Sequence, residues 1–331
     1  MINFRTEVAI PKISLQLSYR RNIMMVGSCF TENIGNNLNN LCFPVETNPC
    51  GILYNPASIA GCIDLLVNEK LCRTSDLFFA NELWNNFYFH SRFSHPDKET
   101  ALNLMNSSLT HAATHLRTAS HLFVTFGTSW VYRENEKGTI VGNCHKLPAS
   151  SFKRERLSVE EMAGQWIDLL DGLFSINPKI KIILTVSPIR HLKDGSYENQ
   201  VSKSGLFLLV DQLINQYGSG RMIYFPSYEL VMDELRDYRF YASDMLHLSE
   251  TAIAFVQEKF NGAFLDMESK EISLKVEKIV RALAHKPFTT DNSAYQNLLS
   301  RLLEEVSQLS ADYPWANFKK LTVDLLQKME M

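Results

Sequence analysis

An apolar run that stops at a glycine delivers two adjacent nucleophilic side chains near the start of the chain. Residues 23–26 are apolar, Gly27 ends the run, and Ser28 and Cys29 follow it. A buried parallel strand has this continuous apolar character. A hydroxyl or thiol just past such a strand lies at a helix N-terminus, where free N–H groups can bind an oxyanion. The segment therefore predicts the turn of an active site.

A short segment far downstream holds residues that can activate such a nucleophile. Asp244 and His247 are three residues apart, and a helix start follows at residues 249–252. Side chains at this spacing on one turn can meet, so the carboxylate can orient the imidazole as a general base. We expect this catalytic role for the pair. The other interpretation of His247 is a capped or surface histidine near a helix start.

The composition is that of an ordinary globular protein. The chain has 331 residues, of which 45% are hydrophobic and 21% charged, so it is long enough to bury a large core. Its formal charge of −3 shows no basic excess. This balance argues against nucleic acid or an anionic membrane as the main partner and favours a small or neutral substrate.

The sequence contains no motif typical of a signal peptide, a membrane span or a cysteine-based metal site. Residues 1–8 lack a basic segment followed by an apolar run, and no later stretch approaches the ~18 apolar residues of a membrane span. The six cysteines form no CxxC pair and no metal-like spacing with histidine. We therefore expect a cytoplasmic protein with reduced thiols and no membrane span.

Apolar segments alternate with helical patterns along most of the chain. Strands are predicted at five places, which are residues 22–27, the surroundings of Val45, and residues 121–127, 179–187 and 221–225. This alternation predicts an α/β fold in which helices cover both faces of a parallel sheet.

Two segments interrupt the alternation, and a helical tail follows it. Residues 77–93 are rich in aromatics around Asn85-Asn86, and residues 130–132 face residues 139–141 across a turn. Both predict hairpins between a strand and the next helix, next to the ligand crevice of the sheet. Beyond Pro287 the chain has helical spacing, and we expect this tail to pack on the domain or on another subunit of a homo-oligomer.

Several motifs together resemble the GSCFA-domain family within the SGNH/GDSL hydrolases. They are Gly27–Thr31, Asn55-Pro56, Phe126–Trp130, Asn143–Lys146, Thr185–His191 and Asp244–His247. The resemblance implies a flavodoxin-like, three-layer α/β/α domain of the SGNH hydrolase type over residues 1–285, with a five-stranded parallel sheet in the order 2-1-3-4-5 and hairpin insertions. It also implies a helical C-terminal extension over residues 286–331.

The resemblance makes Cys29 the nucleophile, because the first motif aligns without gaps to a block whose third residue attacks. Ser28 then falls where the related families carry aspartate. A cysteine at a helix N-terminus beside a histidine has a stabilised thiolate, so we expect a lowered thiol pKa. Two alternatives remain. A shift of the turn by one residue would make Ser28 the nucleophile, and a glycine turn with a buried cysteine would have no catalytic role.

The resemblance does not supply every oxyanion donor. The third conserved sequence block of the SGNH/GDSL hydrolases has an asparagine donor, and Ser129 stands at its position here. Gly127 matches that block. Replacement donors would be Asn55, Asn143 and the backbone N–H groups of Cys29 and Gly51. The alternative for Asn55 is simple turn chemistry before a proline.

Three further polar side chains are candidates for substrate binding. Arg190 and His191 follow the fourth strand, at the sheet edge that carries the nucleophile, and can bind a carboxylate, phosphate or sugar hydroxyl. The alternative for Arg190 is an ion pair with an acid such as Asp194. His145 can likewise either bind the substrate or pair with a nearby group of its own loop.

These residues predict hydrolysis of an acyl ester, with an O-acetylated sugar or a similar metabolite as substrate. No metal or organic cofactor is required for this chemistry. One alternative is an O-acyltransferase, in which a hairpin carrying Trp84, Phe87, Tyr88 and Phe89 excludes water. Another is a non-catalytic carbohydrate-binding protein, which the missing third-block asparagine favours.

Overall fold

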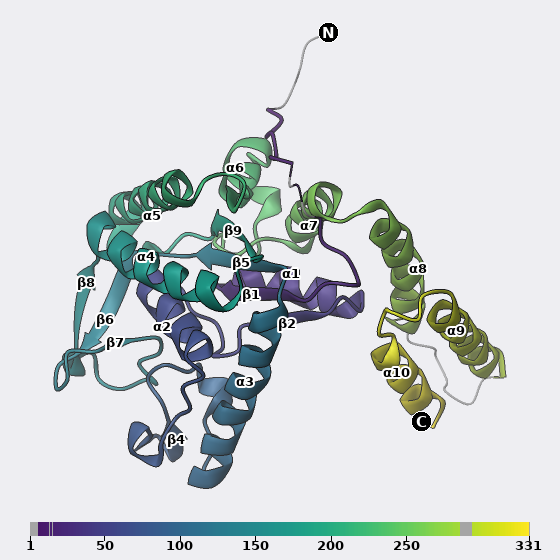
Figure 1. Ribbon diagram of the computed structural model, residues 1–331, viewed down its shortest axis with the longest axis horizontal. Helices are drawn as coiled ribbons and strands as arrows, with labels where there is room; N and C mark the ends of the chain where they lie inside the picture. Colours follow the sequence, from purple (N-terminus) through teal and green to yellow (C-terminus); the bar gives the residue numbers. More distant parts are fainter. Residues whose placement is uncertain (1–5, 13, 15, 285–292, 331) are drawn as a thin grey trace.

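A five-stranded parallel sheet forms the centre of the molecule (Figure 1). The computed structural model describes residues 6–12, 14, 16–284 and 293–330. The strands of the sheet are β1 (Ile23–Gly27), β2 (Val45–Thr47), β5 (His121–Phe126), β9 (Lys181–Val186) and β10 (Met222–Tyr224). They lie in the order β10-β9-β5-β1-β2, and every pairing is parallel. Counted along the chain this order is 2-1-3-4-5, which confirms the predicted sheet.

Alternate residues of each central strand enter two separate cores. Met24 and Val26 of β1 belong to one core, whereas Ile23 and Met25 belong to the other, together with Phe123 of β5. Successive side chains of a strand point to opposite faces of the sheet, so both faces are covered. This double burial explains why the strands appear in the sequence as continuous apolar runs.

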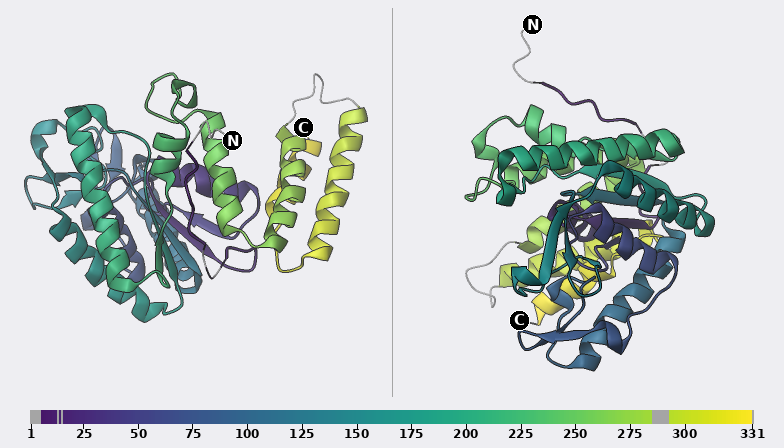
Figure 2. Two further views of the ribbon diagram at one scale, coloured as in Figure 1. Left: turned by 90° about the horizontal axis from the view of Figure 1, so that it is seen from above. Right: turned by 90° about the vertical axis from the view of Figure 1, so that its left-hand side faces the viewer.

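Helices cover the two faces of the sheet (Figures 1 and 2). The first core also contains side chains of α2 (Pro56–Val67), α3 (Lys98–Thr118), α4 (Val159–Ile176) and α5 (Gly195–Tyr217), and the second contains side chains of α1 (Cys29–Asn40) and α7 (Glu250–Phe264). The fold is therefore a three-layer α/β/α sandwich. Among the helices of the described ranges, none has both the length and the apolar character needed to cross a membrane.

Short helical turns connect these elements. They are η1 (Thr74–Asp76), η2 (Ser91–Phe93), η3 (Ala149–Ser151), η4 (Leu192–Asp194), α6 (Ser227–Glu229), η5 (Leu230–Glu234) and η6 (Tyr238–Phe240). The last three lie between β10 and α7 and carry the chain from the edge of the sheet toward Asp244 and His247.

The last three helices lie side by side at one end of the molecule (Figures 1 and 2). They are α8 (Met267–Ala284), α9 (Ser293–Asp312) and α10 (Lys319–Met329), and their apolar side chains extend the second core. The Arg20 guanidinium lies 3.6 Å from the ring centre of Trp315, and Lys320 Nζ donates to Asn40 Oδ1 at 3.0 Å. The C-terminal helices thus pack on their own domain. The predicted boundary at residues 285–286 lies outside the described residues.

The first predicted hairpin exists, but its turn and its place differ from the prediction. Strands β3 (Phe78–Ala80) and β4 (Leu83–Asn85) pair around Asn81 and Glu82, so the predicted centre at Asn85-Asn86 is wrong. Both turn residues have positive φ, 52° and 62°, as the tight turns preferred by hairpins require. The hairpin follows helix α2 rather than a strand.

The second insertion is a three-stranded antiparallel sheet. The strands β6 (Trp130–Glu134) and β7 (Ile140–Val141) form the predicted hairpin, with Tyr132 opposite Val141. A third strand, β8 (Phe152–Arg156), pairs with the other edge of β6. Its sequence is almost entirely charged and resembles a surface segment, which is why the sequence analysis missed it.

The turn after β1 requires glycine at position 27. Gly27 has a φ of 149°, and a Cβ there would lie 2.5 Å from the carbonyl oxygen of Thr125 on the neighbouring strand. Its N–H donates to Asn48 Oδ1 at 2.8 Å, and its carbonyl accepts from the N–H of Leu53 at 3.0 Å. The turn that presents Ser28 and Cys29 is therefore held from two sides.

We predict that Gly27→Ala lowers the free energy of unfolding by about 2–3 kcal/mol, because the new Cβ meets strand backbone that has no room to move. The matched control is Gly164→Ala in the interior of α4, where a Cβ would meet nothing within 4 Å. That variant should be more stable by about 0.5–1 kcal/mol. Urea denaturation measures both. A wild-type midpoint for Gly27→Ala would show that the turn tolerates a side chain.

Candidate active site

A cavity of about 590 Å³ lies where three central strands end. Its lining includes Ser28 and Cys29 after β1, Thr128 after β5 and Ser187 after β9. Ligands of open α/β sheets bind outside the carboxyl ends of the strands, so the cavity has the expected position. His247, which is more than two hundred residues from Cys29 in sequence, lines the same cavity.

The two candidate nucleophiles differ in exposure. Ser28 is the N-cap residue of α1 and is 1% exposed, and its Oγ has no hydrogen-bond partner among the described residues. Cys29 is the first residue of the helix and is partly exposed. Both line the cavity, but the thiol is the more accessible of the two groups.

The surroundings of the Cys29 thiol raise its pKa. Burial is the largest cause, and the N–H groups of Phe30 and of Cys29 itself oppose it. The Glu32 carboxylate raises the pKa further, whereas the Lys203 ammonium lowers it. The net direction is upward, so the prediction of a lowered thiol pKa is wrong. Desolvation of the thiolate outweighs the helix N-terminus, and the thiol needs a base to react at neutral pH.

Asp244 and His247 form a carboxylate–imidazole pair. Asp244 Oδ2 lies 2.6 Å from His247 Nδ1, and Asp244 Oδ1 accepts the N–H groups of Leu246 and His247, both at 2.9 Å. The His247 hydrogen bond and these two N–H groups lower the pKa of Asp244 to about 2. With Nδ1 engaged by the carboxylate, Nε2 is the nitrogen left for proton transfer in the cavity.

Two asparagines line the cavity with their side-chain oxygens already engaged. Asn55 caps α2, and its Oδ1 accepts from the N–H of Ser58 at 2.8 Å. Asn143 Oδ1 accepts from the N–H of His145, also at 2.8 Å. An amide fixed through its oxygen retains its NH₂ group as donor, so both residues can donate to an oxyanion.

Three other predicted residues lie outside the cavity lining and have structural partners. The N–H of Gly51 donates to the carbonyl oxygen of Asn48 at 2.7 Å, and the N–H of Gly127 donates to that of Tyr54, also at 2.7 Å. Ser129 is buried, and its N–H donates to Ser202 Oγ at 2.8 Å. These three amides are therefore not available to an oxyanion. Gly127 and Ser129 instead attach the end of β5 to Tyr54 and to Ser202 of α5.

His145 also lies outside the cavity lining and joins the two insertions. Its Nε2 lies 2.8 Å from the carbonyl oxygen of Asn86, while the carbonyl of Phe87 accepts the N–H of Gly142 at 2.8 Å. Burial is the main cause that lowers the pKa of His145. The segment that follows the first hairpin thus packs against the second insertion on the side away from the cavity lining.

The expected role of the first hairpin in the substrate cleft needs correction. From residues 77–93 only His90 lines the cavity, and the rings expected to exclude water, those of Trp84, Phe87, Tyr88 and Phe89, do not. Trp130 and Tyr132 of β6 provide aromatic lining instead. The second insertion therefore forms the wall, because it follows β5 directly at the carboxyl edge of the sheet.

Arg190 and His191 both line the cavity, as predicted from their place after β9. The alternative partner of Arg190 is excluded, because Asp194 forms its ion pair with Arg154. The ring of His191 meets that of Tyr54 edge on at 5.5 Å. Burial, followed by the charges of Lys203, Arg154 and His247, lowers the pKa of His191 to about 4, so its imidazole is neutral at pH 7.

Sequence reasoning missed Lys203, a buried lysine of α5 beneath the cavity. It is 1% exposed, and its Nζ donates to the carbonyl oxygens of Gly127 and Ser187, both at 2.6 Å. Burial and the Arg190 charge lower its pKa to about 7, and the Cys29 thiol opposes them. The signal in the sequence is a lysine three residues before Leu206, on the apolar face of the helix.

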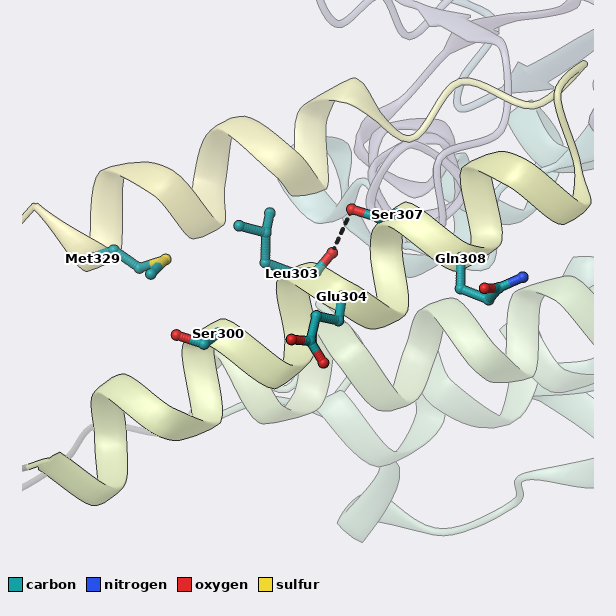
Figure 3. Close-up of a pocket in the computed structure, with 6 residues that line it drawn as sticks. All are labelled: Ser300, Leu303, Glu304, Ser307, Gln308 and Met329. Carbon is teal, nitrogen blue, oxygen red and sulfur yellow. Dashed lines mark hydrogen bonds between the residues drawn. The ribbon is translucent and has the colours of Figure 1, made fainter.

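A second hollow, between α9 and α10, has none of these features (Figure 3). Its volume is about 490 Å³, and Glu304 is the titratable residue among those that line it. The Ser307 hydroxyl donates to the carbonyl of Leu303 at 2.9 Å within its own helix. Nowhere in the described ranges do three or more His, Cys, Asp or Glu side chains gather as a metal site.

Fold and cavity together define a three-layer α/β protein with a hydroxyl, a thiol and a histidine–carboxylate pair at one sheet edge. The chain belongs to the GSCFA family, whose model matches residues 22–260, and a model of the C-terminal domain of GSCFA domain proteins matches residues 276–330. A comparison with curated proteins finds no match.

Two solved structures are similar to this chain at low identity. One is a carbohydrate esterase family 3 from Talaromyces cellulolyticus, 9% identical with a TM-score of 0.36, covering 77% of this chain and 98% of that one. The other is the acetyl xylan esterase Est2A from the rumen bacterium Butyrivibrio proteoclasticus, 11% identical with a TM-score of 0.37, covering 76% of this chain and 63% of that one.

We predict that Lys203 makes stability depend on pH above neutrality. Its pKa is about 7 in the folded chain, against ~10.4 for a free lysine. Between these values the unfolded chain binds more protons, so the free energy of unfolding rises with pH by at most about 1.4 kcal/mol per unit. Wild type should therefore gain stability relative to Lys203→Met as the pH rises from 7 toward 9.

Urea denaturation across this pH range measures the effect. The control is Lys278→Met, an exposed lysine of α8, which should keep the pH slope of wild type. Parallel slopes for wild type and Lys203→Met would contradict the assignment of the titration to this lysine.

Proposed function

We propose that the protein hydrolyses acyl esters, with a nucleophile on the β1–α1 turn and His247 as general base. One observation carries the proposal. Ser28, Cys29 and His247 line the same cavity, and Asp244 engages His247 Nδ1 at 2.6 Å. A nucleophile, a base and a group that orients the base are the parts that acyl transfer through a covalent intermediate requires.

In the proposed reaction, Cys29 Sγ attacks the carbonyl carbon of the ester while its proton passes to His247 Nε2. The Asp244 carboxylate stabilises the imidazolium that results. The NH₂ groups of Asn55 and Asn143 and the N–H of Cys29 are candidate donors to the tetrahedral oxyanion. The alcohol leaves with the proton of His247. Water, deprotonated by His247, then attacks the thioester carbonyl. The acid is released, and Cys29 Sγ leaves and regains its proton from His247.

Exposure favours Cys29 over Ser28 as the nucleophile. Ser28 is 1% exposed, whereas Cys29 is partly exposed at the cavity. The raised pKa of Cys29 means that this thiol, like a serine hydroxyl, must lose its proton to a base during attack.

Hydrolysis fits the site better than acyl transfer. The case for transfer depends on water exclusion by the first hairpin, whose aromatic rings lie outside the cavity lining. The His247 side chain is 56% exposed, so water can reach the base. Trp130 and Tyr132 beside the polar Asn143 make a wall suited to a small ester with both apolar and polar faces, such as an O-acetylated sugar.

We predict that His247→Ala and Asp244→Asn each reduce kcat/KM for 4-nitrophenyl acetate by about 10²–10⁴-fold, because both remove general-base catalysis. Both side chains are solvent-exposed, so the variants should unfold at the wild-type temperature. A matched control is His111→Ala, which removes another exposed histidine paired with a carboxylate, that of Glu46 at 3.1 Å. Wild-type turnover by His247→Ala would refute the pair's catalytic role.

We predict that Cys29→Ala abolishes esterase activity while Ser28→Ala retains most of it. Mass spectrometry of the wild-type protein quenched during turnover should find the acyl group on the peptide that contains Cys29. Iodoacetamide should label Cys29 with a rate that rises at a pH above the ~8.5 of a free thiol, because burial raises its pKa. Cys144→Ala is the control, since Cys144 is the other cysteine of the cavity lining. Acylation of Ser28 would reassign the nucleophile.

A further inference from the structure

The cavity is cationic in a protein that is acidic as a whole. Arg154, Arg190 and Lys193 line it, and none of the described residues in its lining is an aspartate or glutamate. Across the chain, by contrast, 36 acidic residues outnumber 33 basic ones. Lys203, whose pKa is about 7, adds a partial positive charge beneath the cavity floor at neutral pH. The side chains that line the cavity therefore carry more positive than negative charge, unlike the chain as a whole.

Two of the three lining cations have an oxygen partner. Arg154 is paired with Asp194 and lies 4.7 Å from the ring centre of Trp130. Lys193 Nζ donates to the hydroxyl of Tyr132 at 2.5 Å. These contacts connect η4 to β8 and β6 in the wall of the cavity, so both cations already have partners.

Arg190 differs from both. Its Nη2 contacts Met232 Sδ at 3.6 Å, and within the described ranges it has no hydrogen bond to an oxygen atom. A thioether is a weak acceptor, whereas a guanidinium has five N–H donors in a planar fork. Arg190 is partly exposed and lines the cavity, so its N–H donors are open to a ligand there.

Two basic neighbours of Arg190, His191 and Lys203, do not offset its charge. The next residue, His191, has a pKa of about 4 and is neutral at pH 7, and Lys203 is repelled by Arg190 strongly enough for that repulsion to lower the lysine pKa. A bound anion would relieve this repulsion between like charges. Arg190 therefore carries a positive charge that no carboxylate of the described residues pairs with.

We propose that Arg190 binds an anionic group of the ester substrate, a carboxylate or a phosphate. The inference deepens the proposed esterase function and rests on it for the identity of the reacting group. Both oxyanions match the planar fork of arginine through paired N–H···O bonds. The substrate class is therefore a small acidic ester, such as an O-acetylated sugar acid or sugar phosphate, rather than a neutral one.

Binding tests the anion site without requiring catalysis. Glucuronate, glucose 6-phosphate and glucose are titrated into the wild-type protein in a calorimeter. At least one of the two anions should bind ten-fold or more tightly than glucose, and the stronger one identifies the carboxylate or the phosphate. Arg190→Met should weaken that anion at least ten-fold, and Arg190→Lys should restore part of the affinity.

Arg239→Met is the matched control, because it removes an exposed arginine whose partner is Asp237 and which does not line the cavity. It should bind as wild type does. Raising the ionic strength should weaken the anion and leave glucose unchanged, which provides a second readout if the Arg190 variants fold poorly. Equal affinity for glucose and both anions in the wild-type protein would overturn the inference.

Kinetics separates this inference from the proposed function. With acetylated glucuronate and acetylated glucose as substrates, Arg190→Met should reduce kcat/KM for the acidic ester at least ten-fold more than for the neutral one. Equal losses on both esters would overturn the anion site and leave the esterase intact. Anion binding through Arg190 in a protein that hydrolyses neither ester would refute the esterase and leave the anion site intact.

Discussion

A buried ammonium that joins two strand ends is the interaction on which the site depends. Lys203 Nζ holds the carbonyls of Gly127 and Ser187, which continue the neighbouring strands β5 and β9. Burying such a charge is costly, and two short hydrogen bonds to carbonyl oxygens offset part of that cost. The same charge lowers the pKa of the Cys29 thiol and that of His191. One side chain therefore fixes the floor of the cavity and shifts the pKa of two groups that line it.

The burial of the thiol and the exposure of the histidine–carboxylate pair have opposite physical effects. Burial raises the pKa of Cys29, while solvent and three hydrogen bonds keep Asp244 ionised with a pKa of about 2. Glu32, which also raises the thiol pKa, is held by Asn48 Nδ2 at 3.1 Å. Asn48 in turn accepts the N–H of Gly27. The turn that presents Ser28 and Cys29 is thus stabilised by a carboxylate that disfavours the Cys29 thiolate. Such a thiol requires a base to become nucleophilic at neutral pH.

Strands β1, β5 and β9 were readable from the sequence because they are buried on both faces and contain mostly apolar residues, whereas the edge strand β2 is half-buried and contains Glu46 and Thr47. The strand β8 was not readable, since four of its five residues are charged, of which Arg154 lines the cavity. The pairing of Asp244 with His247 followed from their spacing on one turn, which is local information. Gly51, Gly127 and Ser129 looked like oxyanion donors because a sequence does not reveal which carbonyl or hydroxyl already accepts an N–H. Lys203 escaped notice for a similar reason, because its two acceptors come from strand ends far away in the sequence.

The difference between net charge and local charge decides what the cavity can bind. A formal charge of −3 suggests a small or neutral ligand, yet the described lining of the cavity contains cations and no carboxylate. The reason is topological. The β6–β8 insertion brings Arg154 to the wall, η4 brings Lys193, and the loop after β9 brings Arg190. The sheet edge thus positions Ser28 and Cys29, while the insertion and the loop set the charge around them. Changes in those two segments could alter substrate preference without disturbing the β1–α1 turn.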